Sequence, residues 1–157
     1  MLVLGVDPGS LTTGYGLVQK AGNRLIYVEG GKISLPSSAP FSQRIHNIFE
    51  SLVEIIHTYH PEEMSIEDIF FAKNVKSALK IGHARGAILV AAIQCGLKVF
   101  EYTPLEIKQS VVGYGRATKE QVRSMVKLLL QLDIPLSFDT SDALAIAICH
   151  HNWVRIE

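Results

Sequence analysis

The first six residues, Met1 to Val6, form a short apolar run that stops abruptly at Asp7. The β-branched content of the run and its sudden end predict a buried strand. The following residues, Asp7-Pro-Gly-Ser-Leu-Thr-Thr-Gly-Tyr-Gly16, predict a tight turn that leads into a second strand. A carboxylate at the end of a buried strand, with glycines beside it, can face a phosphate or a metal ion without obstruction. Asp-Pro-Gly is also an ordinary turn sequence, so Asp7 indicates a function only if other carboxylates join it.

The remaining apolar periodicity and turn residues predict five strands and five helices. We expect strands at 2–7, 15–19, 25–34, 63–67 and 97–102, and helices at 41–59, 74–95, 104–112, 118–132 and 139–153. Gly30 and Gly31 predict a bulge or bend in the third strand, and Thr118 with Gln121 predicts a capping box. Three consecutive strands followed by alternating helices and strands are typical of an α/β sheet with mixed strand directions. With 157 residues and no long linker, residues 1–157 are expected to form a single domain.

The composition argues against a membrane protein. The longest clear apolar run, 87–93, is far shorter than the roughly 20 residues of a membrane-spanning helix. No basic region precedes the first apolar run, and Asp7 interrupts any signal peptide. Cys95 and Cys149 lie in apolar helical stretches, which favours buried free thiols over a disulfide. We therefore expect a cytoplasmic protein without membrane contact.

The charge is balanced in total but uneven along the chain. The formal net charge is zero, with 15 basic and 15 acidic residues. The segment from Lys73 to Lys127 nevertheless holds ten basic residues and only Glu101, Glu106 and Glu120 as acidic ones. A basic middle segment beside an acidic remainder indicates a surface that binds a polyanion. Ordinary lysines on solvated helices would give the same asymmetry.

Three further carboxylates are candidates to join Asp7. Glu67 ends the strand at 63–67, which can lie beside the first strand, and Asp68 is its alternative because the register is open. Asp139 and Asp142 begin the last helix, and their spacing of three places them on one helical face. The alternative for this pair is an Asp139 N-cap with Asp142 favoured by the helix dipole. The apolar run that follows buries the helix, so its acidic start requires compensation.

Converging carboxylates repel one another unless cations neutralise them. Ligation by oxygen alone selects a hard cation, Mg²⁺ or Mn²⁺, over zinc. Two such ions roughly 3.5–4 Å apart can activate a water molecule and stabilise the leaving oxygen in phosphodiester cleavage. An acidic cluster within a basic surround therefore predicts a nuclease.

Motifs along nearly the whole chain resemble the RuvC family, the bacterial Holliday-junction resolvases. The resemblance rests on these segments: Asp7-Pro-Gly-Ser with Gly14-Tyr-Gly16, Ser65-Ile-Glu67, His83-Ala-Arg-Gly86, Tyr102-Thr-Pro104, Lys108-Gln-Ser-Val-Val-Gly-Tyr-Gly115 and Asp139-Thr-Ser-Asp142-Ala-Leu-Ala-Ile-Ala. It implies a ribonuclease-H-like (retroviral-integrase-like) fold with a mixed five-stranded sheet flanked by helices. It also implies a homodimer that cuts opposed strands of a four-way DNA junction with Mg²⁺, or Mn²⁺ in its place, in recombination and repair.

The resemblance also assigns residues. Asp7, Glu67, Asp139 and Asp142 fall on the family's metal-binding catalytic positions. A complex with a branch-migration helicase is a further implied partner. The sequence ends at Arg155-Ile-Glu157 without the basic tail of many members, which leaves DNA contacts by such a tail open.

Weaker candidates surround the four carboxylates. Phe70 or its neighbour Phe71 can stack on an unpaired base near the crossover, and the resemblance favours Phe70. Lys108 and Lys119 resemble family positions near the scissile phosphate, where a lysine can balance developing charge, although ordinary surface lysines explain them equally well. The candidates for contact with backbone phosphates are Lys76, Lys80, Arg85, Arg116 and Arg123.

Small residues recur every four positions in the helix at 74–95. They are Ala78, Gly82 and Gly86. A glycine inside a helix costs about 1 kcal/mol relative to alanine, so a close-packing reason is expected. A partner helix of a two-fold dimer is the favoured reason, and the chain's own sheet is the alternative.

Other interpretations of the chain remain. A sugar-kinase or actin-like ATPase begins with a similar strand and turn but requires two such lobes. A related nuclease that acts on structured RNA would use the same metal chemistry. A non-catalytic junction-binding module would not need four carboxylates. The histidines indicate no metal site: His46, His57 and His60 lack suitable spacing, and the helix dipole explains His150 and His151 at the end of the last helix.

Overall fold

The computed structural model describes residues 1–68 and 74–154. Its strands are β1 (Leu2–Asp7), β2 (Thr12–Ala21), β3 (Arg24–Ser34), β4 (Glu63–Glu67) and β5 (Lys98–Tyr102). Its helices are α1 (Phe41–Tyr59), α2 (Val75–Gln94), α3 (Pro104–Val111), α4 (Lys119–Leu130) and α5 (Phe138–Trp153). The strands form one sheet in the order β3-β2-β1-β4-β5, as the mixed α/β prediction requires.

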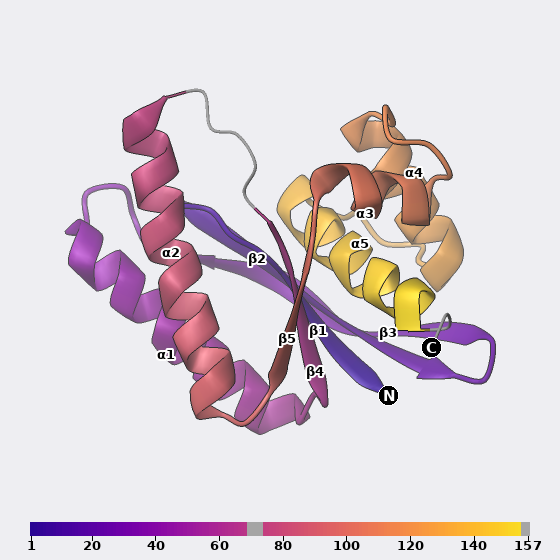
Figure 1. Ribbon diagram of the computed structural model, residues 1–157, viewed down its shortest axis with the longest axis horizontal. Helices are drawn as coiled ribbons and strands as arrows, with labels where there is room; N and C mark the ends of the chain where they lie inside the picture. The colour runs from indigo at the N-terminus through magenta and orange to yellow at the C-terminus, as the bar shows by residue number, and fades with distance from the viewer. Residues whose placement is uncertain (69–73, 155–157) are drawn as a thin grey trace.

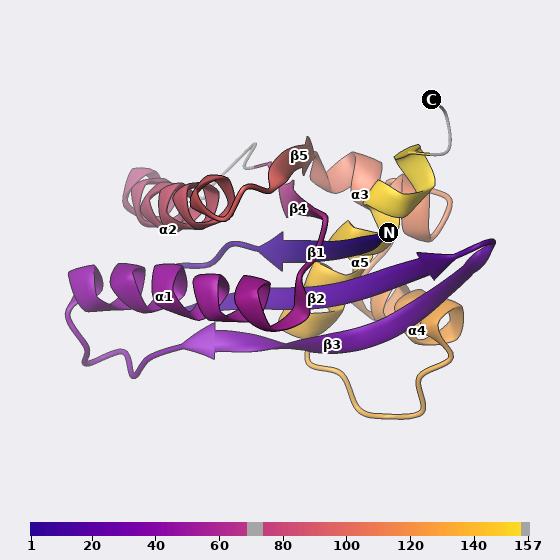
Figure 2. The same cartoon turned by 90° about the horizontal axis from the view of Figure 1, so that it is seen from below.

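Helices cover both faces of this sheet. Figures 1 and 2 show α1 and α2 side by side on one face, and α5 with α3 and α4 on the other. Each face has its own apolar core: the first contains Leu52 and Ile88, and the second contains Val126 and Ile148. In the described residues, no helix combines the length and the apolar character that a membrane span needs.

The strand directions bring several chain segments to one edge of the sheet. β2 is antiparallel to both β1 and β3, while β4 is parallel to β1 and β5 is parallel to β4. β1, β3, β4 and β5 therefore all end at the same edge, which we call the C-terminal edge. α1, α2 and α3 each follow one of these strands, so they begin there (Figure 1). The positive ends of three helix dipoles face this edge.

Glycines in β1 and β2 let α5 lie directly against the sheet. A Cβ atom added to Gly5 would overlap the carbonyl oxygen of Ala143, and one added to Gly14 would overlap that of Asp139. A Cβ at Gly16 would lie 2.6 Å from the side chain of Leu144. The glycines after Asp7 therefore serve mainly to admit a helix, whereas the sequence suggested that they keep a ligand site clear.

Two local predictions about the sheet need correction. β2 begins at Thr12, earlier than residue 15, because it continues to pair with β1 up to the partners Asp7 and Gly14. The irregularity in β3 lies at Val28, since Leu17 pairs with Glu29 and Val18 with Tyr27. Gly30 and Gly31, predicted to form the bulge, are regularly paired. A Cβ at either would come within 2.8 Å of a side-chain atom, so close packing explains both glycines.

Candidate active site

Asp7 and Glu67 lie side by side at the C-terminal edge. In the parallel register of β1 and β4, Val6 is the partner of Ile66, so the next residue of each strand is a carboxylate. Asp68, the alternative to Glu67, is directed elsewhere: its carboxylate lies 3.8 Å from the guanidinium of Arg85 on α2. The structure therefore brings Glu67, rather than Asp68, to Asp7.

The start of α5 adds the other two carboxylates. Its N-cap is Ser137, whose Oγ accepts a hydrogen bond from the N–H of Thr140 at 3.2 Å. The alternative that Asp139 is the N-cap is therefore wrong, and Asp139 lies inside the first turn. Because Ser137 is the cap, neither Asp139 nor Asp142 serves as the N-cap of α5. The hydroxyl group of Ser65, a buried residue of β4, donates a hydrogen bond to the carbonyl oxygen of Ile146 at 3.2 Å and ties the helix to the strand that carries Glu67.

Three of the four carboxylates line one pocket of about 240 Å³. Asp7, Glu67 and Asp142 form its acidic wall, and Lys108 and Lys119 form its basic wall. The rest of the lining is formed by the apolar residues Pro104, Ile107, Val122, Ala145 and Ile146. Asp139 is not part of the lining, although its charge acts on Asp7 and Asp142.

Burial and mutual repulsion raise the pKa values of these acids. The pKa of Asp7 rises from 3.8 to about 8, first because of burial and then because of the charges of Glu67, Asp142 and Asp139. Burial also raises the pKa of Glu67 and of Asp142, and Lys108 and Lys119 oppose both rises. Asp7 therefore holds a proton near neutral pH unless another positive charge replaces it.

The donor set fits a hard divalent cation. The ligands offered are carboxylate oxygens, which suit Mg²⁺ or Mn²⁺ and not a soft metal. Among residues 1–68 and 74–154, no three acidic, histidine or cysteine side chains already enclose a common ion position.

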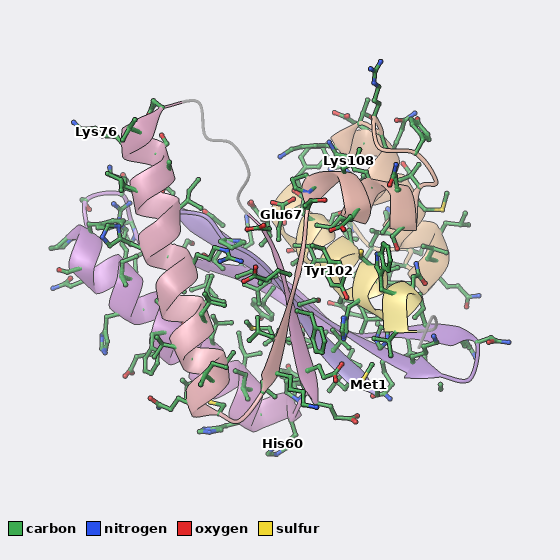
Figure 3. The ribbon with its side chains drawn as sticks, in the orientation of Figure 1. Met1, His60, Glu67, Lys76, Tyr102 and Lys108 are labelled. Atoms are coloured by element: carbon green, nitrogen blue, oxygen red, sulfur yellow. The ribbon has the colours of Figure 1, made fainter. Side chains whose placement is uncertain are left out.

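The two pocket lysines approach the acids from different helices. Lys119, at the start of α4, places its Nζ 3.8 Å from an Oδ atom of Asp142. Lys108 comes from α3, and Figure 3 shows it close to Glu67 at the end of β4. Lys119 is 69% exposed, so its ammonium group remains accessible to a substrate. Of the predicted basic residues, these two share the pocket with the carboxylates.

The other predicted DNA-contact residues have varied surroundings. Lys76 and Lys80 are exposed on α2, and Lys76 extends from its N-terminal end (Figure 3). Arg116 is exposed in the loop before α4. Arg85 is only 15% exposed and lies 2.8 Å from the carboxylate of Glu101, an arrangement that favours a structural role.

Two further candidates complete this set. The guanidinium of Arg123 lies 4.1 Å from the centre of the Phe138 ring, and its Nη1 donates to the carbonyl of Leu136 at 3.4 Å. These contacts hold Arg123 against the loop before α5. The predicted stacking residue Phe70 lies outside the described residues, as does Phe71.

The glycine stripe of α2 faces away from the protein. A Cβ at Gly82 or Gly86 would meet no atom within 4 Å, which contradicts the alternative that these glycines pack against the chain's own sheet. Exposed apolar side chains follow the same helical face: Val75, Leu79, Val90 and Ile93 are 76%, 58%, 57% and 65% exposed. Ala78 is half-buried beside them.

The interpretation of His150 and His151 as residues placed by the helix dipole needs correction. Both are fully buried, so the helix dipole does not explain them. His150 Nε2 lies 2.6 Å from the carboxylate of Glu63, and its Nδ1 lies 2.7 Å from the hydroxyl of Tyr102. His151 Nε2 donates to the carbonyl of Val18 at 2.8 Å, and burial lowers its pKa. The apolar run just before the pair was a signal that these side chains would be internal.

The comparisons with known proteins agree with this geometry. The family model "Crossover junction endodeoxyribonuclease RuvC" matches residues 3–150. The chain belongs to the RuvC family. A RuvC of Geobacter metallireducens is 53% identical over 97% of this chain and 93% of its own length. One from Citrifermentans bemidjiense is 55% identical over 96% of this chain and 92% of its own length.

Solved structures extend the RuvC comparison to three dimensions. The T. thermophilus RuvC, in complex with a Holliday junction substrate, superimposes with a TM-score of 0.94 at 35% identity, covering 99% of this chain and 96% of that one. The fold is thus ribonuclease-H-like, as predicted. The yeast mitochondrial resolvase Ydc2, at 13% identity and a TM-score of 0.70, shares the fold.

Proposed function

We propose that this protein resolves four-way DNA junctions by paired, symmetric hydrolysis of opposed strands, with residues 1–157 acting as one nuclease domain. The observation that carries the proposal is the pocket in which carboxylates from β1, β4 and α5 face Lys108 and Lys119. Membership of the RuvC family supports the junction as the substrate, because its members are named crossover junction endodeoxyribonucleases.

In this proposal Asp7, Glu67, Asp139 and Asp142 hold Mg²⁺. When bound, the cation supplies an activated water molecule and charge stabilisation at the scissile phosphate. The residues of the chain prepare the site for it. Asp7 releases its proton as the positive charge arrives, since its pKa of about 8 results from burial and from the neighbouring acids. The hydrogen bond of Ser65 and the close packing at the glycines of β1 and β2 hold α5 against the sheet. Together they set the position of Asp142.

In the proposal, Lys108 and Lys119 stabilise negative charge in the pocket. Both lower the pKa of Glu67 and of Asp142, so both act electrostatically at the acidic wall. An ammonium group at this position can stabilise the negative charge that develops on the phosphate oxygens. The apolar floor around Ile107 and Val122 lowers the local dielectric and strengthens these interactions.

A homodimer completes the proposal. The exposed stripe on α2 combines Gly82 and Gly86 with Val75, Leu79, Val90 and Ile93, which suits a close crossing with the same helix of a second copy. Two-fold symmetry would place two pockets opposite the two strands of a junction that have to be cut. A branch-migration helicase is the further partner that the resemblance implies.

The deciding experiment compares a synthetic mobile four-way junction with a linear duplex of the same sequence, in Mg²⁺ and in EDTA. We expect paired, symmetric nicks in the junction alone and none in EDTA. Binding without nicks in any divalent cation would instead favour a junction-recognition module. Cleavage of a structured RNA in preference to the junction would favour the related RNA nuclease.

A further inference from the structure

The N-terminal ends of α1 and α2 form a second cationic region at the C-terminal edge. The two helices are neighbours and run in the same direction, as Figures 1 and 2 show. Neither has an acidic residue in its first turn. The N-cap of α1 is Pro40, whose side chain forms no capping hydrogen bond to the first N–H groups. The positive end of the α1 dipole is therefore uncompensated by its own residues.

Arg44 adds a buried charge at this end of α1. It begins the stripe of buried residues that continues with Ile48, Leu52 and Ile56 towards the sheet, and it is only 9% exposed. Its Nε is buried without a hydrogen-bond partner, and no carboxylate among the described residues forms an ion pair with it. A largely buried arginine whose Nε has no hydrogen-bond partner and whose charge has no carboxylate beside it in the described part of the chain is costly, so its presence calls for an anionic partner.

The guanidinium of Arg44 and the ammonium group of Lys80 on α2 lie near the same aromatic ring. Side chains of a helix incline towards its N-terminus, so Arg44 reaches back over the first turn of α1. Its guanidinium carbon lies 5.4 Å from the centre of the Phe41 ring, and the Nζ of Lys80 on α2 lies 5.9 Å from the same centre. His83 of α2 meets this ring edge-on, with the ring centres 5.7 Å apart. We call Phe41, Arg44, Lys80 and His83 the Phe41 cluster.

We propose that the Phe41 cluster and the N-terminus of α1 bind a backbone phosphate of the junction DNA, at a distance from the phosphate that is cut. Helix N-termini and guanidinium groups both bind phosphate in proteins. The cluster shares the C-terminal edge with the carboxylate pocket, so a DNA arm that leaves the pocket can pass over it. The assignment rests on the proposed function for the identity of the DNA, and it adds Arg44 and α1 to the candidates on α2.

Gln43→Glu and Arg44→Met test the site, both in the Asp7→Asn protein, where bound DNA is expected to stay uncut. Gln43 is exposed in the first turn of α1, so a glutamate there stabilises the helix while it repels a phosphate. Arg44→Met replaces a largely buried side chain, which has no carboxylate partner among the described residues, with an apolar, unbranched one. We expect both variants to raise the melting temperature, to weaken junction binding several-fold and to reduce the slope of log K against log salt by about one.

Gln94→Glu is the matched control, because it makes the same chemical change at an exposed residue at the other end of α2. We expect it to leave junction affinity unchanged. Equal losses in Gln94→Glu and Gln43→Glu would overturn the proposal, since net charge alone would then explain the effect. Unchanged affinity in both Gln43→Glu and Arg44→Met would also overturn it, and so would a lower melting temperature of Arg44→Met with normal affinity.

Inorganic phosphate distinguishes a DNA phosphate from free phosphate as the ligand. If phosphate at constant ionic strength stabilises the protein through Arg44, while Gln43→Glu leaves DNA affinity unchanged, the cluster binds free phosphate and the DNA assignment is wrong. The proposed function can fail separately. If the Asp7→Asn protein binds duplex and junction equally, the junction proposal fails, but a selective loss of duplex affinity in Gln43→Glu still supports the phosphate site.

Discussion

The helices α2 and α5 lie on opposite faces of the sheet and use glycine in opposite ways. α5 is buried along eleven residues and has its glycine partners in the strands below it, at Gly5, Gly14 and Gly16. α2 carries Gly82 and Gly86 itself, and both face open space. The glycines opposite α5 admit a helix of the same chain, whereas a Cβ at Gly82 or Gly86 of α2 would meet no atom of the described chain, and the proposed dimer would give these glycines a packing partner.

The largest effect is expected at the acidic start of α5. Asp142→Asn removes one charge from the pocket wall with almost no change in volume. We expect junction cleavage to fall below detection while binding affinity is retained, and the same for Asp7, Glu67 and Asp139. Gel assays of nicking and fluorescence anisotropy of binding measure the two properties separately. Normal nicking by Asp142→Asn would show that this carboxylate does not hold the metal.

The next largest effect is expected from substituting a glycine that faces α5 and a glycine that lies in α2. Gly5→Ala forces a methyl group into the carbonyl oxygen of Ala143, so we expect the free energy of unfolding to fall by about 3 kcal/mol or more. Gly82→Ala meets no atom and improves helix propensity, so we expect a rise of about 1 kcal/mol in the monomer. Urea denaturation at low protein concentration measures both. Changes of the same sign would mean that the glycines of α2 and β1 do not differ as the structure indicates.

The buried carboxyl group of Asp7 at the end of β1 also makes stability depend on pH. Because the pKa of Asp7 is raised from 3.8 to about 8, the folded protein retains a proton that the unfolded chain loses. Stability in EDTA should therefore fall by a few kcal/mol as the pH rises from about 4 to about 8. Asp7→Asn should remove much of this fall, and Mg²⁺ should restore stability at pH 8. Parallel pH profiles for the two proteins would show that Asp7 is not the titrating group.

The smallest expected change in the folded chain is on the exposed stripe of α2. Val90→Glu alters a side chain that is 57% exposed, so the stability of the monomer should change by less than about 0.5 kcal/mol. We expect it to abolish a dimer that forms through α2, as measured by sedimentation equilibrium. Leu128→Glu, on α4 and 70% exposed, is the matched control and should leave the dimer intact. Loss of the dimer in the control alone would move the interface to α4.

Much of the fold could be predicted because local patterns agree with it. Apolar periodicity located the helices α1 and α2 closely, and the capping box of Thr118 and Gln121 is present at the start of α4. The approach of Glu67 to Asp7 was predicted with Asp68 as its alternative, and the register of β1 and β4 in the structure selects Glu67. Apolar periodicity and capping depend on residues a few positions apart, whose spacing the sequence states directly.

The sequence alone therefore determined the order of the elements and the carboxylates at their ends, because capping, periodicity and turn chemistry act over a few residues. Only the tertiary structure decided that Ser137 caps α5, that His150 joins Glu63 to Tyr102, and that the Nε of Arg44 is buried without a hydrogen-bond partner. Each of these depends on contacts between segments far apart in the chain, and a side chain's environment there is set by packing rather than by its neighbours in sequence.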